Sequence, residues 1–352
     1  MKYLHLIGFF IVMSLVQCKS SGQSEAIVKE KMDSLLQIKN PRSFSGVVMI
    51  SKNGNTIYSN AIGFADSLNR KAINISDEFV LLSNSKQITA VLVLQAVDKG
   101  LINLTNPIKN YLPDLTATWA DSITVHQLLN HSSGLSGLNE PLLFPPGTDF
   151  KYSDINYILL GKIIEAVEKQ PYSTLVTQLF EKVGMSHSYF PNFSNQQNLI
   201  IGNKYIGVIK NKSIDSVIIP IEKIPAAGLV STADDMTIWN NALHNGKIIS
   251  PASYQLMTTY TITGQHVTFG PDKIGYGYAL RVQDGMPVNY FGHTGTAPDQ
   301  GFTSLTLWFP QEKISVVVLE NQAYDNMEIN YWFETEIRKL IYDLAATGNL
   351  SY

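Results

Sequence analysis

The sequence contains little cysteine, no long basic run and no hydrophobic stretch long enough for a comfortable membrane span. Cys18 is the only cysteine, so no internal disulfide can form. The 26 basic and 29 acidic residues give a formal net charge of −3, which argues against nucleic acid as the main partner. The motif Gly-x-Ser-x-Gly is also absent, which argues against the nucleophile turn of an α/β-hydrolase.

The composition is that of a globular protein. Of 352 residues, 45% are hydrophobic and 16% are charged, so the chain can bury a sizeable core in one large domain or two subdomains. The first residues of the chain do not fit this globular composition. Lys2 precedes an apolar run from Tyr3 to Val16, which is typical of the core of a signal peptide and predicts export.

Cys18 stands in a context that resembles a bacterial lipoprotein box, in which the cysteine becomes the lipidated N-terminus. Leu15-Val16-Gln17-Cys18 precedes the polar residues 19–22. Gln17 departs from the small residue usual at its position, and the alternative is an ordinary signal peptide cut nearby. We predict a signal peptide at 1–18, a linker at 19–24 and a domain at 25–352, anchored to a membrane of the bacterial cell envelope through a lipid on Cys18.

Periodicity and turn residues predict the order of secondary structure. An amphipathic helix is expected at 25–38. Asn53-Gly54, the strongest two-residue turn signal, predicts a hairpin between strands at 46–51 and 56–58. Residues from about 83 to 224 are mainly helical, with one helix at 157–167. The rest of the chain is predicted to form a helix at 234–244, strands at 276–282, 288–291, 303–309 and 314–319, turns at 284–285 and 310–313, and a last helix at 328–345.

Strands near both ends of the chain with helices between them predict an α+β fold. One antiparallel sheet, formed from about 25–82 and 225–352, is covered by the N-terminal and C-terminal helices in an αβα arrangement. A mainly helical subdomain at about 83–224 interrupts the sheet.

The most informative pattern is Ser83-Asn84-Ser85-Lys86, the one place where a lysine follows a serine by three residues. Residues i and i+3 share a face of a helix, so a helix that opens at Ser83 brings the Lys86 amine to the Ser83 hydroxyl. Apolar residues follow at helical spacing up to Gly100. The electropositive start of a helix favours the neutral amine that a base requires. The alternative is that the pair arises by chance, as short motifs do in long chains.

Two further stretches follow in order. Residues 146–157 contain Tyr152-Ser153-Asp154, and residues 291–296 contain His293-Thr294-Gly295-Thr296. With Ser83 and Lys86 they resemble the serine β-lactamase and penicillin-binding-protein superfamily, most closely its class C-like branch of esterases, D-aminopeptidases and β-lactamase-related hydrolases. That family carries Ser-x-x-Lys, Tyr-x-Asn and then Lys-Thr-Gly or His-x-Gly. The resemblance covers nearly the whole mature chain.

Several rival residues fail on context. Tyr58-Ser59-Asn60 and Tyr324-Asp325-Asn326 are literal Tyr-x-Asn matches, but both lie outside the interval between the other two elements. His244-Asn245-Gly246 ends a predicted helix and is better explained as its cap and turn. His126 and His131 match no metal-binding spacing and are interpreted as structural.

The resemblance implies a role for Tyr152, whose phenol would relay a proton provided that cations such as Lys86 lower its pKa. Asp154 replaces the asparagine of the family. A carboxylate donates no hydrogen bond, and it favours the charged form of Lys86. The alternative is that Tyr152 and Asp154 are only an aromatic residue and an N-cap at a helix start. Leu82 also departs from the small residue often found before the nucleophile, which affects local packing.

The third stretch implies the remainder of the site. By resemblance, the backbone N–H groups of Ser83 and Thr296 form an oxyanion hole, and Gly295 lets substrate lie along the strand edge. His293 takes the place of a permanently charged lysine and is only partly charged near neutrality, which favours esters or small amides over penicillin-like substrates. The alternative for His293 is a hydrogen-bonded structural histidine.

The resemblance therefore implies an exported serine hydrolase that forms an acyl-enzyme with a small ester, amide or peptide. Its catalytic residues are Ser83, Lys86 and Tyr152. Its supporting residues are Asp154, His293, Gly295 and Thr296. No metal or cofactor is implied. The alternative is a non-catalytic lipoprotein that binds cell-wall fragments, and Asp154 and Leu82 keep that alternative open.

Overall fold

The computed structural model describes residues 22–66, 70–192, 194–196, 198–207, 209–214 and 219–350. The predicted signal peptide, Cys18 and residues 19–21 of the predicted linker lie outside these ranges. Residues 22–24 of that linker already belong to the N-terminal helix, 22–36. In the ranges that are described, no helix is both long enough and apolar enough to span a bilayer.

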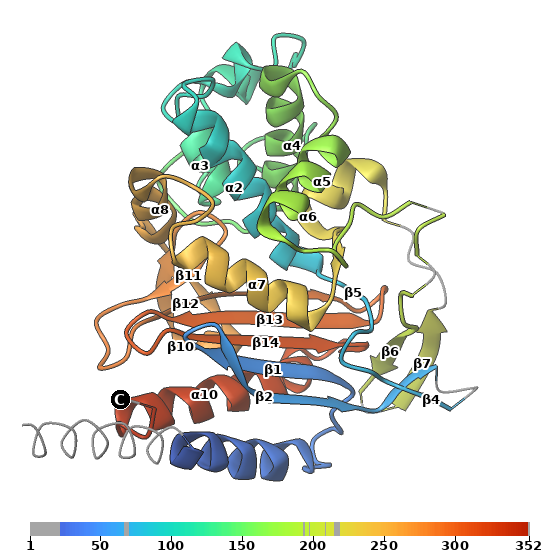
Figure 1. Cartoon of the computed structure of the whole chain (residues 1–352). Coiled ribbons are helices and arrows are strands. Elements are labelled where there is room, and N and C mark those ends of the chain that lie inside the picture. Colours follow the sequence, from blue (N-terminus) through green and yellow to red (C-terminus); the bar gives the residue numbers. More distant parts are fainter. Residues whose placement is uncertain are drawn as a thin grey trace, which may run out of the picture.

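An antiparallel sheet in the order β2-β1-β14-β13-β12-β11-β10-β9 forms the middle layer (Figure 1). Its strands are β1 (Gly46–Lys52), β2 (Asn55–Ile62), β9 (Ile262–His266), β10 (Gly270–Tyr276), β11 (Arg281–Gln283), β12 (Tyr290–Ala297), β13 (Phe302–Phe309) and β14 (Ile314–Glu320). β1 and β14 come from opposite ends of the chain and pair directly, with Gly46 opposite Glu320. The predicted α+β fold with an antiparallel sheet is confirmed.

The alternation of side chains along each strand supplies two separate cores, one on each face of the sheet. In β1, Val48 and Ile50 pack beneath the N-terminal helix and α10 (Trp332–Ala346), whereas Val47 and Met49 face the helical region. β14 alternates in the same way. The hairpin between β1 and β2 turns at Asn53 and Gly54, whose φ values of 51° and 82° are those that an Asn-Gly turn adopts.

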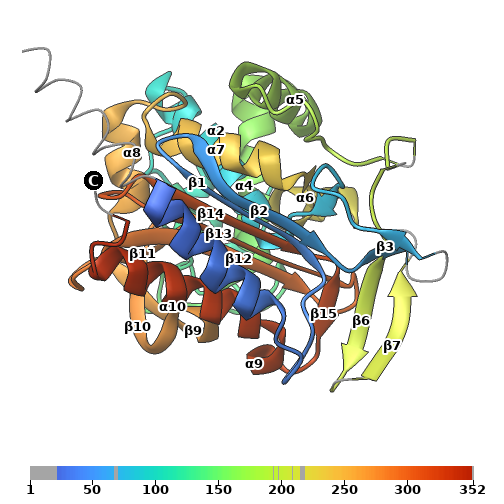
Figure 2. The ribbon, with the colours of Figure 1, turned by 60° about the horizontal axis from the view of Figure 1, so that its bottom comes forward.

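One face of the sheet is covered by the N-terminal helix and α10, which lie side by side (Figure 2). Ser24 donates a hydrogen bond to the carbonyl of Asn349 (2.7 Å), so the two ends of the described chain meet. A buried ion cluster holds the segment between the N-terminal helix and β1 against β14 and α10. In this cluster the Arg42 guanidinium contacts Glu320 at 2.6 Å and Glu334 at 3.1 Å.

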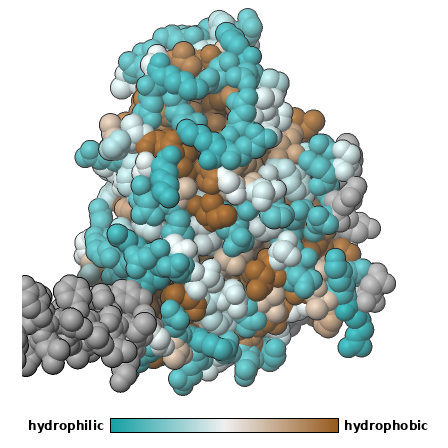
Figure 3. All heavy atoms as spheres, viewed as in Figure 1, coloured by the Kyte–Doolittle hydropathy of each residue, from teal (hydrophilic) through white to brown (hydrophobic). Residues whose placement is uncertain are grey.

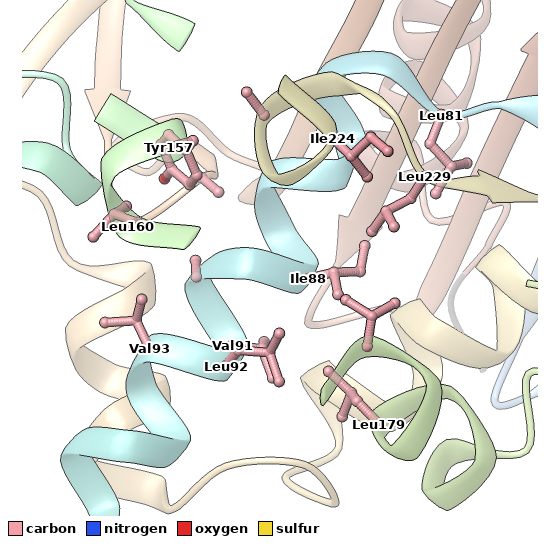
Figure 4. Packing of buried hydrophobic residues seen from close by; sticks show 14 of the residues in the cluster. Leu81, Ile88, Val91, Leu92, Val93, Tyr157, Leu160, Leu179, Ile224 and Leu229 are labelled. Carbon is pink, nitrogen blue, oxygen red and sulfur yellow. The ribbon is translucent and has the colours of Figure 1, made fainter. Parts of the chain in front are cut away.

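The opposite face carries α7 (Ala233–His244) and, above it, the helical region (Figure 1). That region contains α2 (Ser85–Asp98), α3 (Val125–Leu129), α4 (Asp154–Glu168), α5 (Tyr172–Val183), α6 (Ile224–Ala227) and α8 (Pro251–Thr258). α2 lies at its centre and is buried on all sides, with Ile88 and Val91 among the packed side chains (Figure 4). The surface seen from the direction of Figure 1 is largely hydrophilic, with separate groups of hydrophobic residues (Figure 3).

Short strands join the two parts of the molecule. β5 (Phe79–Val80) pairs with β8 (Val230–Ser231) next to the start of α2, β3 (Phe64–Asp66) pairs with β4 (Lys71–Ala72), and β6 (Gly202–Ile206), β7 (Ile209–Ile214) and β15 (Gln322–Tyr324) form a small sheet. The β6–β7 hairpin lies inside the segment that was predicted to be mainly helical.

Several predicted boundaries differ from the structure. The strand expected at 276–282 is interrupted, because residues 277–280 form a turn in which the Gly277 N–H donates to the Leu280 carbonyl (2.8 Å). β12 extends well beyond the strand expected at 288–291, and β9 was not predicted. The last helix is divided at Tyr331 into α9 (Met327–Asn330) and α10.

Candidate active site

Ser83 lies in the turn by which the chain enters the central helix. Leu82–Asn84 form one 3-10 turn and α2 begins at Ser85, so the regular helix starts two residues later than predicted. Leu82 has a left-handed φ of 51°, which costs a non-glycine residue about 1–2 kcal/mol. Leu82 is only 1% exposed. Burying a leucine side chain stabilises the fold by about 1.5–3 kcal/mol, which is enough to offset this backbone cost. The large residue before Ser83 is therefore packed in the core and holds this turn.

Lys86 reaches Ser83 as the spacing predicts, with 3.1 Å between Lys86 Nζ and Ser83 Oγ. The same Nζ donates to Asp154 Oδ1 (2.6 Å) and to the carbonyl of Ala226 (2.8 Å). The Lys86 side chain is completely buried, whereas that of Asp154 is 50% exposed. Burial lowers the pKa of Lys86, and the Asp154 carboxylate acts in the opposite direction. The lowered pKa of Lys86 agrees with the prediction. Its main cause is burial, whereas the prediction assigned it to the start of the helix.

Tyr152 precedes α4, and its ring lies beside Lys86, with 4.8 Å from Nζ to the ring centroid. Its hydroxyl is buried and has no hydrogen-bond partner among the described residues. Burial and then the Asp154 carboxylate raise the pKa of Tyr152, while Ser83 and Arg281 act against them. The prediction that nearby cations lower this pKa is therefore wrong, because burial outweighs them. The phenol is neutral in the resting site.

Asp154 is the first residue of α4, and the N-cap position before it belongs to Ser153. The alternative that Asp154 is an N-cap is therefore wrong. Negative charge at the start of a helix is favourable, so the first position of α4 is a stabilising place for an acidic residue.

The rival tyrosines lie away from this site, as predicted. Tyr58 donates a hydrogen bond to Asp33 (2.9 Å) under the N-terminal helix. Tyr324 stacks on Tyr205, with 4.5 Å between ring centroids. Neither tyrosine lines the pocket that contains Ser83.

The other histidines are held by contacts within the fold. His244 ends α7 and is followed by Gly246 with a φ of 72°, as its predicted role in a cap and turn requires. His126 Nδ1 lies 2.6 Å from the Tyr278 hydroxyl. His131 Nδ1 lies 3.3 Å from the backbone N of Ser153, which donates to it, so His131 fixes the start of α4.

β12 passes directly against the nucleophile turn. A Cβ atom on Gly295 would lie 2.7 Å from the Leu81 carbonyl oxygen and 2.8 Å from the Ser83 nitrogen. The absence of a side chain at Gly295 thus allows the turn that carries Ser83 to approach β12. The prediction was that it allows the substrate to lie along the strand edge. Thr296 follows on the same strand, and its side chain lines the same pocket as Ser83. The two residues assigned to an oxyanion hole therefore border one space.

His293 is enclosed by protein and only 2% exposed. Its Nδ1 lies 2.6 Å from the carbonyl of Thr294, which only accepts, so Nδ1 donates. Its Nε2 lies 2.9 Å from the Tyr276 hydroxyl and accepts from it. Burial lowers the pKa of His293 well below its usual range. The prediction that His293 is partly charged is therefore wrong, and its hydrogen bonds are those of the structural alternative. Its substrate-binding role stays a prediction, because His293 lines the pocket that contains Ser83.

A buried polar network pins the nucleophile turn to β13. Asn84 Nδ2 donates to Ser304 Oγ (2.8 Å), and that hydroxyl donates to the Leu81 carbonyl (2.7 Å). Gln87 Nε2 donates to Thr306 Oγ1 (2.8 Å) one turn further along α2. Hydrogen bonds on both sides of Ser83 thus fix the position of its backbone.

Arg281 of β11 is a site residue that sequence reasoning missed. It lines a pocket of about 420 Å³ together with Ser83, Phe150, Tyr152, His266, His293, Thr296 and Tyr331. The side chain is 3% exposed and donates from Nη1 to the carbonyl of Gly264 (3.2 Å), while Nε has no acceptor. No carboxylate in the described ranges forms an ion pair with it. Arg281 is the charged residue in the strand predicted at 276–282, and this was the signal in the sequence that could have indicated a site residue.

Metal-binding groups do not accompany these residues. Over the ranges that the structure covers, no group of three or more His, Cys, Asp or Glu side chains is arranged to hold a metal ion.

Comparisons with known proteins identify the family and the fold that this chain resembles. A family model described as Beta-lactamase matches residues 25–337. "Putative penicillin-binding protein PbpX" of Bacillus subtilis (strain 168) is 26% identical over 351 residues, which cover 94% of this chain and 83% of that protein. "Protein flp" of Staphylococcus aureus (strain N315) is 24% identical over 304 residues, and the match covers 78% of this chain and 59% of that protein.

The fold is also shared with a solved structure of D-amino acid amidase from Ochrobactrum anthropi SV3 in complex with L-phenylalanine amide. The two structures superpose with a TM-score of 0.75 at 21% sequence identity. The superposition covers 92% of this chain and 99% of the amidase.

Proposed function

The chain belongs to the beta-lactamase family, and from this membership we propose that it is a serine hydrolase that acts through an acyl-enzyme. One observation carries the proposal: Ser83 Oγ lies 3.1 Å from the buried Nζ of Lys86 at the wall of a pocket. A hydroxyl becomes a useful nucleophile when a base at this distance accepts its proton.

The reaction follows from these groups. When Lys86 is neutral, its amine accepts the Ser83 proton as Oγ bonds to the substrate carbonyl carbon, and the carbonyl electrons move to oxygen. The N–H groups of Ser83 and Thr296 stabilise that oxyanion, and one such donor is commonly worth about 3–4 kcal/mol. The neutral Tyr152 phenol passes a proton to the leaving group and is reprotonated by Lys86. Water then releases the acyl group by the same steps in reverse.

Arg281 indicates the class of substrate. Its guanidinium borders the pocket without a carboxylate partner among the described residues, and a carboxylate is the group that a guanidinium binds best. We propose that the substrate is a small ester or amide that carries a carboxylate, such as a peptide with a free C-terminus. This replaces the preference for uncharged substrates inferred from His293, because the fixed positive charge is supplied by β11.

Labelling with a serine-reactive phosphonate tests the proposal directly. The wild-type protein is expected to form one covalent adduct at Ser83 and to hydrolyse at least one of a p-nitrophenyl ester, a D-amino acid amide and a chromogenic cephalosporin. Ser83→Ala should abolish both labelling and turnover with an unchanged circular-dichroism spectrum. Undiminished hydrolysis by that variant would refute the assignment, and a wild-type protein that neither labels nor turns over would favour the non-catalytic binding protein.

We also propose that the chain is exported and held at the cell envelope by a lipid on Cys18. The supporting observations are the apolar run from Tyr3 to Val16 and the lipoprotein-like residues before Cys18.

A further inference from the structure

Lys86 in the resting site is surrounded by hydrogen-bond acceptors. Its Nζ contacts Ser83 Oγ at 3.1 Å, Asp154 Oδ1 at 2.6 Å and the Ala226 carbonyl at 2.8 Å. An ammonium group has three N–H donors, whereas a neutral amine has two donors and one lone pair. The Asp154 carboxylate and the Ala226 carbonyl only accept, whereas the Ser83 hydroxyl either accepts or donates, so the two protonation states of Lys86 differ at Ser83. In the charged form no lone pair faces Ser83, so Ser83 accepts a hydrogen bond and its proton has no acceptor at Lys86.

Asp154 is the contact that favours this charged form. The Ala226 carbonyl and the Ser83 hydroxyl are neutral, while the Asp154 carboxylate is negative and forms an ion pair with Lys86. The rings of Tyr152 and Tyr157 lie 4.8 Å and 5.7 Å from Nζ and also favour a positive charge there.

Burial acts against the charge of Lys86. Complete burial lowers the pKa of Lys86, and Asp154 is the group that raises it. His131 and His293 are buried near Lys86 and neutral, because burial and neighbouring positive charges keep their pKa values low. Arg281 is a permanent positive charge in the pocket that Ser83 lines.

Asp154 also connects Lys86 with solvent. The Lys86 side chain has no exposed surface, whereas that of Asp154 is 50% exposed at the start of α4. Among the three contacts of Nζ, Asp154 alone combines an ionisable group with an exposed surface. Proton exchange between the buried amine and water therefore has a short route across this ion pair.

We propose that Asp154 is a positioning residue that keeps Lys86 protonated in the resting enzyme and thereby sets the pH above which Ser83 becomes nucleophilic. The proposal rests on the serine-hydrolase function. In the activating step the Lys86 ammonium loses one proton to solvent through Asp154 and becomes a neutral amine. That amine then accepts the Ser83 proton as the C–O bond to the substrate forms, so charge and protons balance.

The first test reads the protonation of Lys86 without any substrate. Protein labelled with ¹³C-lysine is titrated by NMR, and the Lys86 signal is assigned by its loss in Lys86→Arg. We expect Lys86 to be charged at pH 7 in the wild type and to titrate about one pH unit lower in Asp154→Asn, since a nearby opposite charge typically shifts a pKa by about 1–3 units and Asp154 is half exposed. A neutral Lys86 in the wild type, or an unchanged titration in Asp154→Asn, would overturn the proposal.

The second test follows kcat/KM for an ester between pH 5 and 10. Asp154→Asn removes the charge that raises the Lys86 pKa, so the rising part of the pH profile should move to lower pH. Relative to the plateau of the same profile, kcat/KM at pH 6 should increase about tenfold over the wild type. Glu168→Gln is the matched control, because it removes a carboxylate that pairs with Lys99 (2.7 Å) at the far end of the same helix, and its profile should equal the wild type. An equal loss of rate at every pH in Asp154→Asn would overturn the proposal. Absence of Ser83-dependent turnover would refute only the hydrolase function, since the NMR titration needs none.

Discussion

At the scale of residues, burial decides the charge of His293, whereas residue type decides the charge of Arg281. His293 is neutral because burial lowers its pKa well below the usual range, and the Thr294 carbonyl and the Tyr276 phenol fix which ring nitrogen carries the proton. Arg281 keeps its charge because a guanidinium is not deprotonated in proteins, even though burial lowers its pKa. The fixed positive charge at this pocket is therefore on β11, one strand away from the position where the family motif places it.

Replacing Arg281 should separate substrates by charge. Arg281→Gln is expected to lower kcat/KM about 10-fold to 100-fold for a substrate with a free carboxylate, because a charge-assisted hydrogen bond contributes about 1.5–3 kcal/mol. The methyl ester of the same substrate should be affected much less, and Arg281→Lys should restore part of the loss. Steady-state kinetics on the matched pair of substrates measures this.

Arg338→Gln is the control for Arg281, because Arg338 also donates to a backbone carbonyl, that of Thr268 at 2.7 Å, and also lies over a tyrosine ring. It does not line the pocket and should leave the ratio of the two substrates unchanged. An equal loss on acid and methyl ester in Arg281→Gln would show that Arg281 supports the fold of the pocket and does not bind a carboxylate.

At the scale of elements, the site exists because β12 and the turn before α2 lie closer together than two side chains would allow. A single methyl group at Gly295 would overlap both the Leu81 carbonyl and the Ser83 nitrogen. The polar network from Asn84 and Gln87 to β13 prevents the turn from moving away freely.

Gly295→Ala should therefore misplace Ser83 while the pocket walls remain. We expect phosphonate labelling and turnover to fall at least about 100-fold, since a displacement of about 1 Å at a catalytic group has this effect. The measurement is the labelling rate together with the melting temperature. Gly100→Ala is the control, because its positive φ of 73° makes alanine destabilising by about 1 kcal/mol, far from β12. A Gly295→Ala protein with normal labelling would contradict this account of the glycine.

Much of this architecture was predictable from local patterns. The Asn53-Gly54 hairpin, the strands at 303–309 and 314–319, and the helix that carries Lys86 follow from turn chemistry, alternation and spacing. The order of Ser83, Tyr152 and Thr296 along the chain also predicted that they border one site, and all three line the same pocket.

The remaining features depend on tertiary contacts. β12 continues through Gly292 and Gly295, although glycine is depleted in strands, because β13 pairs with both residues. The turn at 277–280 requires a positive φ of 54° at Ala279, which no local residue signals. The neutral state of His293, the burial of Lys86 and the entry of Arg281 into the pocket arise from elements distant in sequence, so spacing alone did not indicate them.

At the scale of the whole molecule, the proposed anchor at Cys18 would place the domain close to a membrane, because the N-terminal helix begins by residue 22. When the chain is expressed with its own N-terminus, we expect the wild-type protein in the detergent phase of a phase-separation experiment. Cys18→Ser should appear in the aqueous phase or remain unprocessed, because the thiol is the group that receives the lipid.

Ser83→Ala is the control for fractionation, since it alters the site without altering the N-terminus, and it should partition as the wild type does. A wild-type protein that is found in the aqueous phase with a free thiol, or that is cleaved beyond Cys18, would contradict the anchor while leaving the hydrolase function unaffected.

The pairing of β1 with β14 also determines when this chain is able to fold. Gly46 meets Glu320 only after nearly the whole polypeptide is available, so neither core is complete on an N-terminal fragment. Such distant pairing makes folding slow, because the entropy of closing a very long loop is lost before the contacts that repay it form. For an exported chain, this delay is an advantage during translocation. With the proposed export, the polypeptide would remain unfolded until its last strand and α10 have crossed, and the domain would assemble on the far side of the membrane.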